Sequence, residues 1–138
     1  MSIAVYGGTF NPPHCGHLIV AESVAVSSPR LDGEDAYWLE MRPSDGGRIV
    51  IVRRAGTSDP VDVTPAGFNV RTRVHEYGGG SYTVAEGLVF FTNFADQRLY
   101  RQDPDAAPKP ITPVAKLRFA DLVVDRGRGR IICVREDH

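Results

Sequence analysis

The sequence has few cysteines, no long apolar run and no helical hydrophobic pattern of useful length. Its two cysteines, Cys15 and Cys133, stand near opposite ends of the 138 residues. A secreted domain held together by disulfides would use more, so we expect both thiols to be free. No apolar run exceeds four residues, which is far too short to span a bilayer or to form the core of a signal peptide. These absences exclude a disulfide scaffold and a helical membrane protein, and they favour a cytoplasmic protein.

The chain also lacks an excess of charge. Its 16 lysines and arginines are balanced by 17 aspartates and glutamates, which gives a formal net charge of -1. A nucleic-acid-binding domain usually carries a clear basic excess, so we expect no nucleic-acid partner. The length allows one domain with a modest core, and the 42% hydrophobic content is ordinary for a globular protein.

Short runs rich in β-branched and aromatic residues follow one another from Ser28 onward, separated by glycine, proline and aspartate. Such runs at regular spacing are typical of antiparallel strands. We interpret Ser28–Gly33 as a turn and find no later segment of ten or more residues with helical periodicity. The predicted strands are Ala36–Glu40, Arg48–Arg53, Val61–Thr64, Ser81–Val84, Leu88–Asn93, Arg98–Gln102, Pro110–Thr112, Ala120–Asp125 and Arg130–Arg135.

These strands fall into repeated sets. The first two sets close on the same phrase, Val63-Thr64-Pro65 and Ile111-Thr112-Pro113, and a third set begins near Ala120. Units of four short strands that recur every forty to fifty residues or so indicate a β-propeller. The sequence therefore predicts an all-β fold: a partial, incomplete β-propeller of two to three four-stranded blades over residues 28–138. A short N-terminal strand, loop, and helix or strand over residues 1–27 precedes it.

Several phrases in this region carry a family resemblance. Tyr37-Trp38-Leu39-Glu40, the run Val70-Arg71-Thr72-Arg73-Val74-His75-Glu76-Tyr77-Gly78-Gly79-Gly80, and Asn93 to Tyr100 are similar to the N-terminal propeller of prolyl-oligopeptidase-family serine peptidases, of the dipeptidyl-aminopeptidase and acylaminoacyl-peptidase type. The resemblance extends from about Leu18 to the end of the chain. It implies a non-catalytic propeller that caps an α/β-hydrolase domain and admits peptides, but not folded proteins, to the catalytic serine.

The hydrolase domain that this resemblance implies is not encoded here. The sequence contains no Gly-x-Ser-x-Gly elbow, and Gly79-Gly80-Ser81-Tyr82-Thr83 lacks the closing glycine. We therefore expect a fragment without catalytic residues, whose partners are peptide substrates or the missing hydrolase domain. Because fewer than four blades cannot close a ring, we also expect open strand edges and self-association through them.

A different pattern occupies the N-terminus. The apolar strand Ser2–Tyr6 leads into Gly7-Gly8-Thr9-Phe10-Asn11-Pro12-Pro13-His14-Cys15-Gly16-His17. Glycines that let the backbone approach a ligand, followed by imidazoles at a helix start, suit phosphate binding. The string resembles the motif of nicotinate-mononucleotide adenylyltransferases, which transfer AMP from ATP with Mg²⁺. That resemblance implies nucleotide binding by Gly8, Thr9, Phe10, His14 and His17.

A phosphate-binding loop of this kind needs a parallel sheet and a helix to hold it. The segment Leu18–Ser28 is rich in β-branched residues and alternates like a strand in its second half, and no alternation of strands and helices follows. The preferred hypothesis is thus a non-catalytic propeller fragment with an out-of-context nucleotidyltransferase-like loop, a chimera joined near His17-Leu18. The alternatives are an adenylyltransferase-like nucleotide-binding protein and a peptide-binding module that uses exposed blade edges. A zinc site at His14, Cys15 and His17 would lack a fourth ligand, so no metal site is predicted.

Two expectations concern side chains in the blades. Tyr37, Trp38, Phe90 and Phe91 should belong to the blade core, because large aromatic groups dominate such cores. Arg71 and Arg73 should share one strand face, opposite Val70, Thr72 and Val74, since alternate residues of a strand point to opposite sides. That face is either solvated or in contact with a substrate or another domain.

Overall fold

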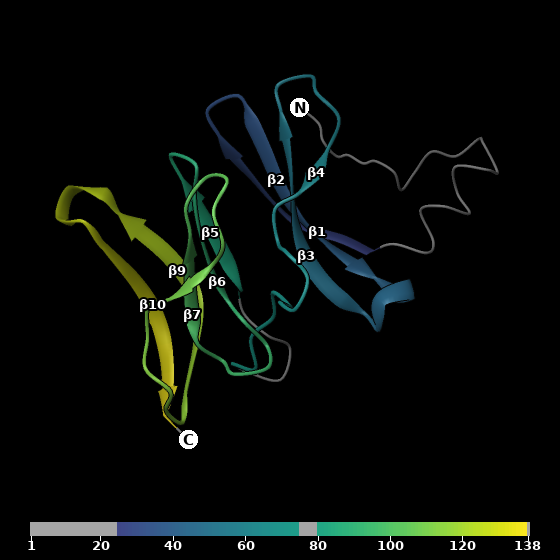
Figure 1. The fold of residues 1–138 in the computed structure, drawn as a ribbon. Coiled ribbons are helices and arrows are strands. Elements are labelled where there is room, and N and C mark those ends of the chain that lie inside the picture. Colours follow the sequence, from purple (N-terminus) through teal and green to yellow (C-terminus); the bar gives the residue numbers. More distant parts are fainter. Residues whose placement is uncertain (1–24, 75–79, 138) are drawn as a thin grey trace.

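The computed structural model describes residues 25–74 and 80–137, and every described sheet is antiparallel. Three sheets stand side by side, and the sheet formed by residues 82–110 lies between the other two (Figure 1). The structure confirms the predicted fold class, a partial β-propeller. The 24 residues before Ala25, which include most of the predicted N-terminal segment, lie outside the described part of the chain.

The first two sheets are four-stranded meanders in which each strand pairs with the next one in sequence. Blade 1 has the order β1-β2-β3-β4 and blade 2 has the order β5-β6-β7-β8. Their strands are β1 Ala25–Asp32, β2 Asp35–Arg42, β3 Arg48–Ala55, β4 Val61–Asp62, β5 Tyr82–Ala85, β6 Leu88–Thr92, β7 Leu99–Gln102 and β8 Lys109–Pro110. A short 3₁₀ turn, η2 Pro43–Asp45, lies between β2 and β3.

The third sheet is a two-stranded hairpin of β9 Leu117–Asp125 and β10 Arg130–Asp137, joined through the 3₁₀ turn η3 Arg126–Arg128. It packs against blade 2, and we refer to it as blade 3. Among the described residues the three sheets form no closed ring, and no described helix is long and apolar enough to cross a membrane.

The turn predicted at Ser28–Gly33 is wrong. Residues Ala25–Asp32 form strand β1, and the turn is confined to Gly33 and Glu34. The pairing of β1 with β2 shifts between Ser27 and Arg30, which marks a β-bulge. A bulge on a strand that pairs on one side only is a place where a sheet tolerates proline, and this explains how Pro29 lies within a strand.

The core consists of two apolar layers, one between each pair of neighbouring blades. The layer between blades 1 and 2 contains Tyr37, Leu39, Ile51, Val70, Tyr82, Val89, Phe91 and Tyr100. The layer between blades 2 and 3 contains Phe90, Leu99, Phe119 and Leu122. Blade 2 supplies both layers because successive side chains of a strand alternate between its two faces.

Three of the four aromatic residues predicted for the core are buried. Tyr37, Phe90 and Phe91 are each less than 9% exposed, which confirms the prediction for them. Trp38 is only half-buried, because it lies on the face of β2 that is opposite Tyr37. Its indole N–H donates to Glu40 Oε2 at 2.8 Å.

The repeated phrase of the sequence has the same structural role in both blades. Thr64 Oγ1 accepts the backbone N–H of Ile51 at 2.9 Å, and Thr112 Oγ1 accepts the backbone N–H of Leu99 at 3.1 Å. In each case the threonine follows a two-residue outer strand, β4 or β8. Its side-chain oxygen accepts a backbone N–H of the neighbouring strand, β3 or β7. The threonine hydroxyl thus satisfies a backbone donor that the short outer strand leaves without a partner.

Candidate functional site

The residues predicted to bind nucleotide all lie outside the described part of the chain. Gly8, Thr9, Phe10, His14 and His17 belong to residues 1–24, as does the junction near Leu18. Their prediction therefore stays a prediction. The described residues contain two other features that could bind a ligand. One is a cavity between blades 1 and 2, and the other is a pair of arginines over an aromatic ring.

The cavity has a volume of about 260 Å³ and lies between the first two blades. Blade 1 contributes Asp35 and Arg53, and blade 2 contributes Gln102 from β7 and Asp105 from the loop after it. This volume is slightly below the roughly 300–1,000 Å³ of typical ligand pockets. At about 30 Å³ per water, it would hold roughly eight waters or a small organic group.

The carboxylates of the cavity are largely committed to holding the two blades and their strands. Asp35 pairs with Arg53 at 2.9 Å, and Asp103 pairs with Arg101 at 2.7 Å. Asp32 in blade 1 accepts the backbone N–H groups of Glu86 and Gly87 in blade 2 at 3.0 and 2.7 Å. The contacts of Asp32 therefore join the end of β1 in blade 1 to the turn before β6 in blade 2.

Gln102 carries the unsatisfied group of the cavity. Its side-chain nitrogen donates to the carbonyl oxygens of Val63 at 2.9 Å and Ala106 at 3.1 Å, while its Oε1 is buried without a hydrogen-bond partner. Two carbonyl acceptors fix which end of the amide is the nitrogen. Tyr37 also lines the cavity, and burial raises the pKa of its hydroxyl above the ordinary value of 10.0. Among the described residues no group of three or more His, Cys, Asp or Glu side chains could hold a metal ion.

An acid-dependent stability is predicted for the rim of this cavity. Arg42 donates to both oxygens of Asp62 at 3.1 and 2.8 Å, and this hydrogen bonding lowers the pKa of Asp62 below its ordinary value of 3.8. A carboxyl group with a lower pKa in the folded state stabilises the fold above that ordinary value, and the contribution is lost as the pH falls through the lowered value.

Asp62→Asn should therefore lower the free energy of unfolding by less than about 1 kcal/mol at neutral pH, and this difference from the wild type should disappear as the pH falls below about 4. Urea unfolding at several pH values measures this effect. Asp59→Asn is the control, because Asp59 is exposed in the loop before β4. Equal acid sensitivity of the Asp62→Asn protein and the wild type would contradict the prediction.

The second feature is the arginine pair, Arg71 and Arg73, on the segment that connects blade 1 to blade 2. Burial alternates along this segment: Val70 and Val74 are fully buried and Thr72 is 5% exposed, whereas both arginines are exposed. This confirms the predicted arrangement of the two arginines on one face.

The backbone beneath the arginine pair is fixed by hydrogen bonds. The N–H of Arg71 donates to the carbonyl of Thr92 at 3.1 Å, and the N–H of Arg73 donates to Gln97 Oε1 at 2.9 Å. Between them, Thr72 Oγ1 donates to the carbonyl of Phe119 in blade 3 at 2.6 Å. One short segment is thus attached to blade 2 and to blade 3.

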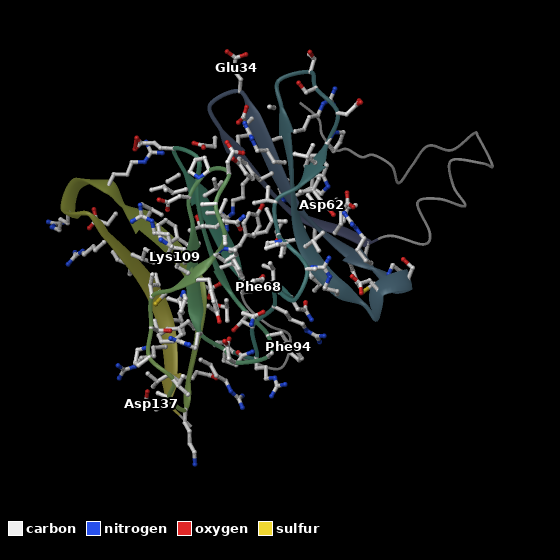
Figure 2. The ribbon with its side chains drawn as sticks, in the orientation of Figure 1. Glu34, Asp62, Phe68, Phe94, Lys109 and Asp137 are labelled. Carbon is white, nitrogen blue, oxygen red and sulfur yellow. The ribbon has the colours of Figure 1, made fainter. Side chains whose placement is uncertain are left out.

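Both guanidinium groups lie over the ring of Phe94, which Figure 2 labels beside the connection after β6. The guanidinium carbons of Arg71 and Arg73 are 4.9 and 4.4 Å from the ring centroid. Cation–π contacts of this kind attract a guanidinium group to the face of the ring and restrain its position. The sequence indicated the outward face of the arginines, but not the ring beneath them, because Phe94 is more than twenty residues later.

Comparisons with known proteins find two kinds of similarity, one to nucleotidyltransferases and one to enzymes that hydrolyse puromycin. A family model described as cytidylyltransferase-like matches residues 5–30. Two curated relatives, both named probable nicotinate-nucleotide adenylyltransferase, come from Salinibacter ruber and Lactiplantibacillus plantarum. The first is 36% identical over 89 residues, 61% of this chain and 44% of the relative. The second is 36% identical over 84 residues, 59% of this chain and 39% of the relative.

Two similar solved structures are enzymes named for the hydrolysis of puromycin. One is a Mycobacterium tuberculosis puromycin-hydrolyzing peptidase, with a TM-score of 0.76 and 38% identity over 84% of this chain. The other is a puromycin hydrolase, with a TM-score of 0.76 and 37% identity over 81% of this chain. The chain spans 19% of each of these structures and less than half of each adenylyltransferase named above.

Both resemblances inferred from the sequence are thus confirmed: a nucleotidyltransferase-like motif at the N-terminus and peptidase propeller blades after it. Alignments of 84–89 residues necessarily extend past residue 30 into the described strands. Those strands are antiparallel, and no α-helix occurs in residues 25–74 or 80–137. The described residues therefore do not form the parallel sheet with helices that supports a phosphate-binding loop.

Proposed function

We propose that this chain supplies non-catalytic β-propeller blades that control access of peptides to a serine peptidase of the prolyl-oligopeptidase type. The observation that carries the proposal is the likeness to the two peptidase structures, which reaches 37–38% identity at a TM-score of 0.76 over more than four-fifths of the chain. Identity at this level, together with the same blade arrangement, supports a shared role in a larger peptidase. The partner is then an α/β-hydrolase domain.

The substrate class follows from the same relatives. Both are named for hydrolysis of puromycin, an aminoacyl nucleoside with an amide bond. We infer that the blades screen small amide substrates of this kind, including short peptides. The scarcity of cysteine and the absence of apolar runs longer than four residues support a cytoplasmic location.

A domain exchange tests this role. Residues 25–137 would replace the equivalent blades of the Mycobacterium tuberculosis puromycin-hydrolyzing peptidase. The chimera is expected to hydrolyse puromycin and to leave a folded protein substrate intact, as the proposed screening role requires. The matched control carries the same blades with Phe91→Ala, which disturbs their core. A soluble, folded chimera that hydrolyses no puromycin, or that digests folded protein, would contradict the proposal.

The second candidate function is nucleotide binding with AMP transfer from ATP and Mg²⁺. It is favoured by the family match over residues 5–30, which contains Gly8, Thr9, Phe10, His14 and His17. Calorimetry with ATP and Mg²⁺ on the full chain tests it, with His17→Ala as the variant and His75→Ala as the control. Saturable binding that only His17→Ala removes would support this function, and absence of binding in the wild type would exclude it.

Self-association is proposed as a consequence of the open edges. Blade 3 exposes apolar side chains on both of its strands: Val123 is 58% exposed, Ile132 is 50% exposed and Val134 is 39% exposed. Unpaired edges and exposed apolar groups promote association between chains. Sedimentation should therefore show species larger than a monomer, and a single monomeric species at all concentrations would contradict this expectation.

A further inference from the structure

The arginine pair places two positive charges together over one aromatic ring. No ion pair within 4.0 Å joins Arg71 or Arg73 to any acidic group among residues 25–74 and 80–137. Elsewhere in the described chain, Arg42, Arg53, Arg101 and Arg130 each have a carboxylate partner within 3.0 Å. Arg71 and Arg73 differ from these four in that both lie over the same aromatic ring.

A third arginine adds to the positive potential at this position. Arg118, at the start of β9, donates from Nη1 to the backbone carbonyl of Arg73 at 3.4 Å. Its charge is therefore held beside the arginine pair by blade 3, while Phe94 holds the pair from blade 2. Neighbouring like charges repel one another, and a bound anion would relieve this repulsion.

The arrangement of donors indicates the type of anion. Among residues 25–74 and 80–137, no hydrogen bond is made by a side-chain N–H of Arg71 or Arg73, and both residues are exposed. A planar fork matches a carboxylate in a bidentate geometry. Phe94 is half-buried beside the forks and offers an apolar surface for the carbon atoms next to that carboxylate.

We propose that Arg71 and Arg73, held over Phe94, form a binding site for the carboxylate group of a peptide. The fixed backbone supports this assignment, because Thr92 and Gln97 hold the N–H groups of both arginines in place before any ligand arrives. The contacts of both guanidinium groups with Phe94 also restrain the side chains, so binding costs less side-chain entropy than it would at two unrestrained arginines. The site does not depend on the proposed peptidase role, since carboxylate binding is measurable on this chain alone.

Two peptide groups carry such a carboxylate, the C-terminus and an acidic side chain, and matched probes distinguish them. The first pair is acetyl-Ala-Ala-Ala with a free C-terminus and the same peptide with a C-terminal amide. The second pair is acetyl-Ala-Glu-Ala-amide and acetyl-Ala-Gln-Ala-amide. Each is titrated into the full chain while NMR follows the Nε–Hε resonances of the arginine side chains.

A carboxylate-bearing probe is expected to shift the resonances of Arg71 and Arg73 together, with a Kd on the order of 1 mM, as exposed ion pairs allow. The amide or glutamine counterpart should bind at least about tenfold more weakly. Whichever pair shows the difference identifies the source of the carboxylate. Inorganic phosphate is titrated in parallel.

Matched variants separate the site from general charge effects. Arg71→Lys and Arg73→Lys keep the charge but lose the planar fork, and each should weaken binding about fivefold. Phe94→Leu should weaken it similarly. Arg126→Lys is the control, because Arg126 is also exposed and its contact with Glu86 is a long 3.8 Å. Far-UV circular dichroism checks that each variant is folded.

Three results would overturn the proposal. They are equal binding of acid and amide peptides, tighter binding of phosphate than of either carboxylate peptide, and an equal effect of Arg126→Lys and Arg73→Lys. Absence of any saturable shift up to about ten times the expected Kd would also overturn it.

Discussion

Replacement of Phe91 by alanine is expected to lower the free energy of unfolding by about 3–5 kcal/mol. Phe91 is fully buried in the layer between blades 1 and 2. Its ring stacks on Tyr100 with centroids 5.5 Å apart, and it meets the edge of Phe68 at 5.9 Å. The substitution removes these contacts and leaves a cavity that rigid strands on both sides cannot fill.

Urea unfolding followed by the fluorescence of Trp38 measures this loss. Because a domain of this size is stable by only about 5–15 kcal/mol, the variant should lose much of its stability. Val123→Ala is the control, since Val123 is 58% exposed on β9 and should cost less than about 0.5 kcal/mol. Similar unfolding midpoints for the two variants would show that the layer between blades 1 and 2 is not the core described here.

The second large effect is expected at Thr64. Its hydroxyl accepts the N–H of Ile51, and the two residues are 2% and 0% exposed. Thr64→Val keeps the shape of the side chain but leaves this backbone donor buried without an acceptor. An unsatisfied buried group costs about 1–3 kcal/mol, so we expect a loss in that range.

The repeat provides its own matched comparison for this prediction. Thr112 makes the equivalent bond to the N–H of Leu99 in blade 2, but Thr112 is only partly buried. Water can replace a lost partner more easily there, so Thr112→Val should cost less than Thr64→Val. Equal costs in urea unfolding, or a larger cost for Thr112→Val, would contradict this account.

The strands were predictable because their patterns are local. Alternation along Leu88–Thr92 and turn residues on either side are sufficient to place β6, and the repeated Thr64 and Thr112 phrases place the outer strands. The exception is β1. Pro29 suggested a turn, yet a bulge in the pairing of β1 with β2 accommodates it. A bulge depends on the partner strand, so the local sequence does not predict it.

The candidate sites were less predictable because they depend on contacts between blades. The cavity exists only because Asp32, Asp35 and Arg53 of blade 1 face Gln102 of blade 2, and no sequence spacing encodes that packing. The arginine pair was half predictable. Alternation placed Arg71 and Arg73 on one face, but Phe94 reaches them only through the fixed connection after β6.

The two resemblances imply different folds for the residues that follow the N-terminal motif. A nucleotidyltransferase-like loop needs parallel strands and helices after it, whereas residues from Ala25 onward pair as antiparallel meanders. The family match to residues 5–30 and blade strand β1 overlap over residues 25–30. In the described structure these six residues belong to the blade.

Far-UV circular dichroism of the full chain tests the central claim most directly, namely that the residues after the N-terminal motif fold as β-blades. A strand-dominated spectrum with helix content below about one-tenth is expected, since the described residues contain only strands, turns and two 3₁₀ turns. Helix content near the roughly one-third of an average globular domain would contradict the account, because a helical scaffold for the N-terminal motif would then exist.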